Sequence, residues 1–257
     1  MFEARTVEPA RLRVALDAVR DCAADVTLTV SPEGVFTEAI DSASAVLVTL
    51  FLGEEDFEHF RCDSPMQLRV SLADVARVLR AMGGAASVTL ASRDGRSLVV
   101  CAEHGDGDAP SVSEYELRAG PGESPGIGAD GHVDYKVTLG VGGERLTLIM
   151  QSVSTVADDF SLSVGGSSAA FSASGPVGDV RVRLAHKVLA SQPNETVEVE
   201  AAEECSGKFA VKYLAPLGRA RSLAPRVTLA LSEGAPLRAE LRFGKAGKLT
   251  YYVAPRL

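Results

Sequence analysis

Short segments in which apolar and polar residues alternate dominate the chain and predict β-strands. Such segments span residues 26–30, 45–52, 97–102, 134–139 and 227–231. They are rich in β-branched residues and are bounded by Gly, Pro, Asp or Ser, as is typical of half-buried strands. Turn signals recur at short intervals, for example Ser31-Pro32-Glu33-Gly34 and Arg93-Asp94-Gly95. This spacing favours an antiparallel, β-rich fold over alternating βαβ units.

Four stretches instead repeat their apolar residues with the period of an α-helix. They span residues 9–23, 72–82, 143–156 and, more briefly, 209–221. In the second stretch, Ser71 is a candidate cap and the apolar stripe runs from Leu72 to Met82. Pro216 lies within the fourth stretch, and we expect it to limit or kink that helix.

The order of the predicted elements repeats along the chain. A helix followed by a strand, a tight turn and another strand spans residues 9–40, and the same order recurs over residues 143–174. Between these copies lies a segment rich in Gly and Pro, a composition that supports neither helix nor regular strand. We therefore predict an α+β fold of two similar β-rich domains with two helices each. The predicted bounds are 1–118 and 134–257, with a connecting loop over 119–133.

Composition limits the class of protein. The 257 residues suffice for one large domain or two of about 130 residues. The net charge of −8, taken alone, argues against nucleic-acid binding. The four cysteines lie far apart without a C-x-x-C pair, so neither a zinc site nor a disulfide scaffold is predicted. Because no membrane span or signal peptide is evident, we expect a soluble intracellular protein.

Arginines lie on the outer faces of several predicted helices. The residues concerned are Arg13, Arg20, Arg77, Arg80, Arg219 and Arg221. Arg77 and Arg80 are about 60° apart on the side of their helix opposite the apolar stripe. The third predicted helix has no charge on its exposed face. Two interpretations remain open: ordinary solvated helix faces, or a basic strip that contacts phosphates without reading bases.

An enzyme is a competing hypothesis, because a predicted strand is followed by the Gly-rich residues 140–143 and a helix, as in a dinucleotide-binding turn. A G-x-G-x-x-G motif would need glycine at position 145, where the chain has Arg145, and no G-K-[ST] follows. Four scattered histidines provide no ligand pair and no base beside a nucleophile: His59, His104, His132 and His186. No catalytic residue, cofactor or metal is therefore predicted.

Six short motifs occur in order over the whole chain. They are Met1-Phe2-Glu3-Ala4-Arg5, Ile40-Asp41-Ser42, Phe60-Arg61-Cys62-Asp63, Glu114-Tyr115-Glu116, Phe171-Ser172-Ala173-Ser174-Gly175 and Leu249-Thr250-Tyr251-Tyr252-Val253-Ala254-Pro255. Each motif is short, but as an ordered set they resemble the proliferating cell nuclear antigen family of DNA sliding clamps. The plan of two similar halves and four helices agrees with this resemblance.

The resemblance implies a homotrimeric, pseudo-sixfold ring located in the nucleus, or in an infected host cell for a viral member. Double-stranded DNA would pass through the ring without sequence-specific contacts, and no membrane would be involved. A DNA polymerase, a clamp loader and other proteins with short docking peptides would bind one face. Such a ring raises the effective concentration of its partners at DNA. The alternative is a subunit of a heterotrimeric checkpoint clamp with the same fold.

The resemblance also assigns roles to individual residues. The six arginines named above would face the DNA, whereas Leu148 and Gln151 replace basic residues of the family on the third helix. The partner-peptide pocket would contain Ile40, Ser44, Ala45, Leu47, Ile127, Pro236, Tyr252, Ala254 and Pro255. The subunit interface would join edge strands 111–118 and 179–185 through Tyr115, Glu116, Val180 and Val182.

Overall fold

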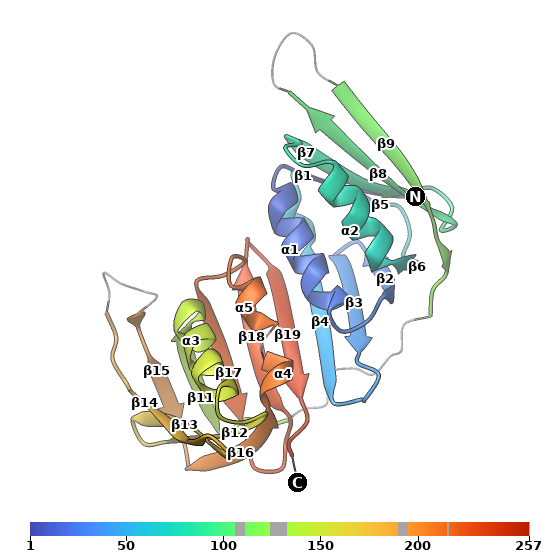
Figure 1. Cartoon of the computed structure of the whole chain (residues 1–257). Helices are drawn as coiled ribbons and strands as arrows, with labels where there is room; N and C mark the ends of the chain where they lie inside the picture. The colour runs from blue at the N-terminus through green and yellow to red at the C-terminus, as the bar shows by residue number, and fades with distance from the viewer. Residues whose placement is uncertain (106–110, 124–132, 190–194, 215, 257) are drawn as a thin grey trace. The chain divides into compact units, whose positions relative to one another are not determined.

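The computed structural model describes residues 1–105, 111–123, 133–189, 195–214 and 216–256. The chain divides into two compact units. The first unit comprises Met1–Ser42, Val48–Ile127 and Phe243–Leu249, and the second comprises Ala43–Leu47, Gly128–Arg242 and Thr250–Leu257. Both units combine antiparallel sheets with helices (Figure 1), so the predicted α+β class is confirmed. The predicted connecting loop lies mostly outside the described residues, and its bounds stay a prediction.

A five-stranded antiparallel sheet forms one layer of the first unit, with strand order β5-β1-β7-β8-β9. Its strands are β1 (Phe2–Thr6), β5 (His59–Cys62), β7 (Ser87–Ser92), β8 (Ser97–His104) and β9 (Ser111–Arg118). Strand β9 pairs with β8 along its whole length, from His104 opposite Ser111 to Ser97 opposite Arg118. Within the described residues, the other side of β9 has no partner strand.

The other strands of the first unit follow the order β10-β6-β2-β3-β4. They are β2 (Asp25–Ser31), β3 (Gly34–Ile40), β4 (Val46–Gly53), β6 (Met66–Ser71) and β10 (Gly120–Pro121), with a 3-10 turn η1 (Glu54–Asp56) after β4. Gly34 has φ +143°, and a Cβ there would lie 2.1 Å from the Leu52 carbonyl oxygen, so only glycine fits. The expectation that the Gly/Pro-rich segment contains no strand is wrong at Gly120–Pro121. Proline is tolerated there because β10 is an edge strand.

Helices α1 (Pro9–Arg20) and α2 (Leu72–Ala81) pack against each other in the first unit (Figure 1). Pro9 occupies the first turn of α1, where its missing N–H has no intrahelical role. The Ser71 hydroxyl accepts a hydrogen bond from the Asp74 amide at 3.3 Å, which confirms the predicted cap of α2. Helix α1 ends three residues before the predicted Ala23, and the Asp21 and Ala23 amides close its last turn.

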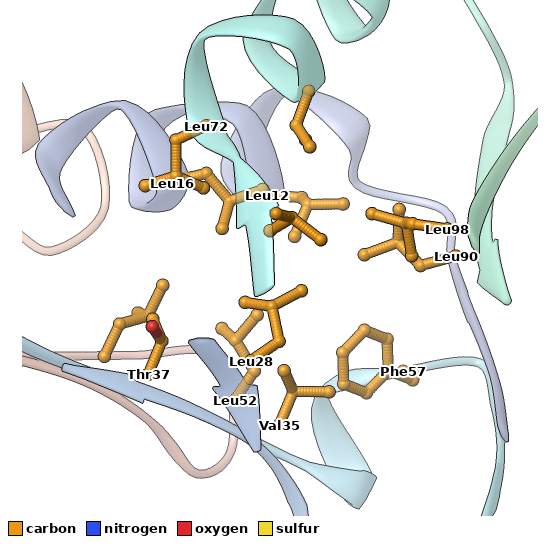
Figure 2. Close-up of a pocket in the computed structure, with 13 residues that line it drawn as sticks. Leu12, Leu16, Leu28, Val35, Thr37, Leu52, Phe57, Leu72, Leu90 and Leu98 are labelled. Atoms are coloured by element: carbon orange, nitrogen blue, oxygen red, sulfur yellow. The ribbon is translucent and has the colours of Figure 1, made fainter. Parts of the chain in front are cut away.

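Leucine side chains from the helices and from both sheets meet in the core of the first unit (Figure 2). Leu12 and Leu16 of α1 and Leu72 of α2 point toward Leu28 and Leu52, and all five are at most 6% exposed. Burial of one such side chain contributes about 1.5–3 kcal/mol. The predicted apolar stripes of α1 and α2 are therefore the faces that hold the helices on the sheets.

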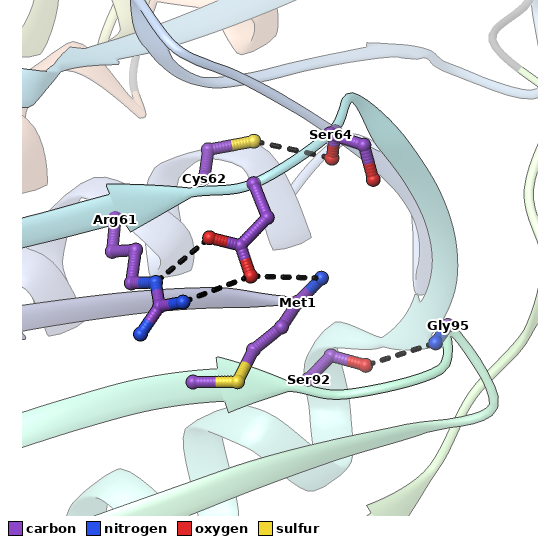
Figure 3. A network of polar contacts seen from close by, with 7 residues as sticks. Met1, Arg61, Cys62, Ser64, Ser92 and Gly95 are labelled. Atoms are coloured by element: carbon purple, nitrogen blue, oxygen red, sulfur yellow. Dashed lines mark hydrogen bonds and ion pairs between the residues drawn. The ribbon is translucent and has the colours of Figure 1, made fainter.

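The N-terminal strand β1 is fixed to β5 by polar contacts at its start (Figure 3). The Asp63 carboxylate accepts hydrogen bonds from Arg61 Nε at 2.7 Å and Nη2 at 3.2 Å, and lies 3.9 Å from the Met1 amino nitrogen. Hydrogen bonding to Arg61 holds the pKa of the Asp63 carboxyl below its usual value. The Cys62 thiol donates to the Ser64 carbonyl oxygen at 3.3 Å. This sequence motif therefore has a structural role in joining the two strands.

The second unit repeats the plan of the first, with α3 (Gly143–Ser154) followed by β12 (Asp159–Gly165) and β13 (Ser168–Gly175). A four-stranded sheet has the order β14-β13-β12-β16, with β14 (Gly178–Ala185) at one edge and β16 (Cys205–Ala210) at the other. The remaining strands follow the order β19-β18-β17-β11-β15. They are β11 (Val137–Gly142), β15 (Glu198–Ala201), β17 (Arg226–Leu231), β18 (Leu237–Phe243) and β19 (Gly247–Val253).

Two predicted elements of the second unit have different bounds in the structure. Strand β11 begins at Val137 rather than at residue 134, and Tyr135 just before it donates a side-chain hydrogen bond to the Pro236 carbonyl oxygen. The fourth predicted helix loses residues 209 and 210 to β16. Its remainder forms α4 (Val211–Leu214) and α5 (Leu217–Ala220), and Pro216 lies between the two short helices, in agreement with the prediction that it limits or kinks the helix.

Candidate nucleic-acid and partner interfaces

The described residues show neither a membrane-crossing helix nor a metal-binding cluster. No described helix is long and apolar enough to span a bilayer. No three His, Cys, Asp or Glu side chains among the described residues gather where they could hold a metal ion. All four cysteines are free thiols. Burial, with the nearby charges of Asp41 and Asp21, raises the pKa of Cys22 to about 12, so this thiol stays protonated and unreactive at neutral pH.

Positive charge is concentrated on the helices of this acidic chain. The five described α-helices carry eight Lys or Arg residues and three Asp or Glu residues. The whole chain, by contrast, carries 26 basic and 34 acidic residues. Because the strands and loops hold the excess of acid, the helices are the part of the surface that can attract an anionic polymer.

Four arginines project from the packed pair α1 and α2. Arg77 and Arg80 are exposed, and Arg13 and Arg20 are partly exposed. Arg77 lies 3.0 Å from Asp74, and Arg20 lies 2.9 Å from Asp17. The Arg77–Asp74 pair is exposed, and such pairs are weak, so a phosphate can compete for Arg77. The predicted exposure is confirmed for Arg77 and Arg80 and is partial for Arg13 and Arg20. We define these four residues as the arginine strip of the first unit.

The helix pair of the second unit presents less charge. Arg219 on α5 and Arg221 just after it are both exposed. On α3, Leu148 is 63% exposed and Gln151 is also exposed, which agrees with the predicted loss of charge from that face. Arg145, near the start of α3, reaches the Glu195 carbonyl oxygen at 3.5 Å. Any electrostatic contact with DNA is therefore expected to be stronger at the first unit than at the second.

Strands β9 and β14 are edge strands of their sheets, as predicted. On β9, Val112 is 64% and Tyr115 is 41% exposed, and Glu114 and Glu116 are exposed as well. On β14, Val180 and Val182 are half-buried, and the exposed arginines are Arg181 and Arg183. A free edge strand can pair with another chain. One edge is mainly acidic and the other mainly basic, so two copies of the chain are complementary at these edges.

The predicted partner pocket draws on several segments of the second unit. The Ala254 amide donates to the Ala45 carbonyl oxygen at 2.9 Å, so these two predicted residues are neighbours. Leu47, Pro236, Tyr252 and Pro255 are half-buried. Ser44 is exposed and has φ +51°, a left-handed conformation that is costly for a residue with a side chain. Ile40 belongs to the first unit, and Ile127 lies outside the described residues.

Tyr135 is a further member of this region that the sequence analysis did not identify. Its hydroxyl donates to the Pro236 carbonyl oxygen at 3.1 Å, and burial together with the nearby Tyr252 raises its pKa. The Arg238 guanidinium carbon lies 4.7 Å from the centre of the Tyr135 ring. In the sequence, the only indication of this position was an aromatic residue between the Gly-rich segment and a predicted strand. Tyr135, Pro236 and Tyr252 together make an aromatic and apolar surface, which we call the tyrosine surface.

The last residues of the described chain are fixed to the four-stranded sheet. The Arg256 amide donates to the Lys208 carbonyl oxygen at 2.7 Å. The Asp159 carboxylate lies 3.3 Å from Arg256 Nε and 3.8 Å from Lys208 Nζ. Together with the bond from Ala254 to Ala45, these contacts hold the C-terminal segment in place. It can therefore serve as a preformed wall of the partner pocket.

Comparison with known proteins identifies both halves of the chain. Residues 1–119 match the family model described as the N-terminal domain of proliferating cell nuclear antigen, and residues 131–256 match its C-terminal domain. A proliferating cell nuclear antigen from Chaetomium thermophilum is 27% identical over 258 aligned positions. That alignment covers 100% of this chain and 98% of the relative.

Proposed function

Because both halves are DNA-clamp domains and the chain belongs to the proliferating cell nuclear antigen family, we propose that it is a replicative sliding clamp. In this proposal, three copies form a ring around double-stranded DNA, in the nucleus or in an infected host cell. The ring tethers a DNA polymerase and other replication and repair factors, is opened by a clamp loader, and has no catalytic activity of its own.

The observation that carries the DNA-binding part of this proposal is the arginine strip in an otherwise acidic protein. Arg13, Arg20, Arg77 and Arg80 project from one packed helix pair, and Arg219 and Arg221 project from the second unit. Guanidinium groups contact phosphates without reading base edges, as a ring that moves along DNA requires. Repulsion between the acidic remainder of the surface and DNA would help to keep the duplex away from the other faces.

Replacement of Arg77 and Arg80 by alanine is expected to weaken polymerase stimulation on primed DNA about fivefold at low salt. Each arginine lost removes one phosphate contact, so the variant should depend less on salt than the wild type, and the difference between them should shrink as the salt concentration rises. The measurement is the length of DNA extension products with and without the clamp. The variant should keep the oligomeric state of the wild type, because both side chains are exposed.

The matched control is replacement of Arg93 and Arg96 by alanine. These exposed residues lie at the turn between β7 and β8, and their loss changes the net charge by the same amount. Stimulation by this control should equal that of the wild type. Equal stimulation by the two double variants would exclude a DNA-contacting role for α2.

The tyrosine surface, with Ala45, Ala254 and Pro255 beside it, is the part of the second unit that we propose binds short partner peptides. Half-buried aromatic and proline side chains supply apolar area at low entropic cost, and such residues are frequent binding hot spots. Ser44 and Leu47 of the second unit are further proposed members, whereas the predicted members Ile40 and Ile127 belong to the first unit and to the residues outside the described ones, respectively. We define the docking peptide as a synthetic, fluorescein-labelled peptide whose anchor combines an aliphatic and an aromatic residue, to match the apolar and aromatic character of the tyrosine surface.

Replacement of Tyr252 by alanine is expected to weaken docking-peptide binding about tenfold, because a central aromatic contact is lost. The measurement is fluorescence anisotropy with increasing protein concentration. Replacement of Tyr213 by alanine is the control, since this half-exposed tyrosine on α4 is outside the proposed pocket. An unchanged affinity in the Tyr252 variant would show that the peptide binds elsewhere.

The oligomeric state in solution distinguishes the replicative clamp from a subunit of a heterotrimeric checkpoint clamp. A trimer formed by this chain alone supports the replicative proposal, and the complementary edges of β9 and β14 favour this outcome. A chain that stays monomeric at every concentration tested, yet assembles with two related chains, would establish the alternative. Sedimentation velocity over a range of concentrations provides this measurement.

A further inference from the structure

Arg238 lies beside the tyrosine surface without an acidic partner among the described residues. It extends from β18 on the strand face that also carries Glu240 and Arg242, opposite the buried Leu237 and Ala239. The Arg238 guanidinium carbon lies 4.7 Å from the centre of the Tyr135 ring. Its Nε atom is shielded from solvent and has no hydrogen-bond acceptor. The side chain as a whole is only half-buried, so its charged end is partly exposed and has no acceptor among the described residues.

Neither Glu240 nor Tyr135 supplies a hydrogen-bond acceptor to Arg238. Glu240 is the next carboxylate along the strand face, and its Oε1 accepts a hydrogen bond from Arg242 Nε at 2.7 Å. The Tyr135 hydroxyl donates to the Pro236 carbonyl oxygen, so its proton is directed away from Arg238. Arg238 and Arg242 thus have different surroundings, since only Arg242 has an ion pair among the described residues.

The contact with the Tyr135 ring leaves the terminal Nη groups of Arg238 as the donors that a ligand can reach. A guanidinium over an aromatic ring makes a cation–π contact through its charge. Its N–H donors lie in the plane of the group, where the two Nη groups can bind both oxygens of a carboxylate. Such charged, two-point hydrogen bonds are among the strongest in proteins. The ring of Tyr135 also orients the arginine, which lowers the entropic cost of binding.

We propose that Arg238 selects docking peptides that carry an aspartate or glutamate beside their apolar and aromatic anchor. This inference rests on the proposed peptide-binding function of the tyrosine surface and adds a requirement to it. An acidic residue placed to reach Arg238 would accept hydrogen bonds from its terminal Nη groups, while the anchor covers Tyr135, Pro236 and Tyr252. Partners of this clamp should therefore differ in affinity according to one charge, and this preference should weaken as salt is added.

The test compares two matched series of the docking peptide. In one series an aspartate occupies each position flanking the anchor in turn, and in the other an asparagine occupies the same position. For at least one position, the aspartate peptide should bind the wild-type protein about tenfold more tightly than its asparagine counterpart. This comparison needs no protein variant. A preference below about twofold at every position, with both series bound, would overturn the role of Arg238 alone.

Protein variants assign the preference to one side chain. In Arg238→Gln the ratio of the two affinities should fall to about one, and in Arg238→Lys it should be intermediate, because the charge remains without the planar donor pair. Arg242→Gln is the matched control and should keep the wild-type ratio, since Arg242 already binds Glu240. Persistence of the full preference in Arg238→Gln would overturn the inference. Failure of both peptide series to bind the wild type would instead overturn the proposed peptide function.

Discussion

Replacement of Glu114 and Glu116 by arginine should convert the proposed trimer into single subunits. Both glutamates are exposed on the edge strand β9, and the edge strand β14 presents exposed Arg181 and Arg183. If these edges pair between copies, the double variant places like charges opposite one another at every interface. Such juxtaposition costs several kcal/mol. A loss of about 3 kcal/mol per interface weakens association more than a hundredfold.

Sedimentation velocity at micromolar protein concentration measures this change. Replacement of Glu54 and Glu55 by arginine is the control, because it makes the same charge change on the exposed turn η1, away from β9. The most demanding test is rescue, in which Arg181→Glu and Arg183→Glu are added to the first pair. The fourfold variant should regain the trimer, because the charges are complementary again. A trimer that survives the double variant would show that these edges are not the interface.

Helix faces could be predicted from the sequence because local pattern determines them, whereas the edge strands were expected only from the family resemblance. The stripe from Leu72 to Met82 repeats at helical spacing, and all its members are buried in the structure. Pro216 ended a helix for a reason that is intrinsic to proline, its missing N–H. The exposure of Arg77 and Arg80 followed from the same periodicity. Such features need no knowledge of distant parts of the chain.

The arrangement around the tyrosine surface could not be predicted, because it depends on contacts between distant segments. Tyr135 was assigned to a strand from its neighbours, whereas its hydroxyl bonds to Pro236, 101 residues away. Arg238 had no distinguishing signal, since Arg242 on the same strand has an identical local pattern. Only the structure separates the arginine over a tyrosine ring from the arginine in an ion pair. The ion pair between Arg256 and Asp159 likewise joins distant segments of the chain and could not be predicted from local pattern.

The most destabilising single substitution that we predict is Phe160→Ala in the second unit. Phe160 is 1% exposed, and its ring lies 6.0 Å from those of both Phe171 and Phe209. Truncation removes buried apolar area and leaves a cavity among three strands, which costs about 3–5 kcal/mol. Loss of two aromatic contacts places the expected value toward the upper end of that range. The glutamate-to-arginine variant of β9 is the suitable background, because subunit association would otherwise add to the apparent stability.

Phe60→Ala in the same background is the matched control. Phe60 also stacks on another ring, that of Phe57 at 5.5 Å, but it is only half-buried on the edge strand β5. Its truncation should cost about 1 kcal/mol, since partly exposed side chains lose less transfer energy and leave no closed cavity. Urea denaturation followed by circular dichroism gives both values. Equal losses would mean that ring stacking, rather than burial, determines the stability at these sites. A larger loss for Phe160 identifies the cluster of Phe160, Phe171 and Phe209 as the core that keeps β12, β13 and β16 together. Strand β14, the basic edge of the proposed trimer interface, pairs with β13 and depends on the same core.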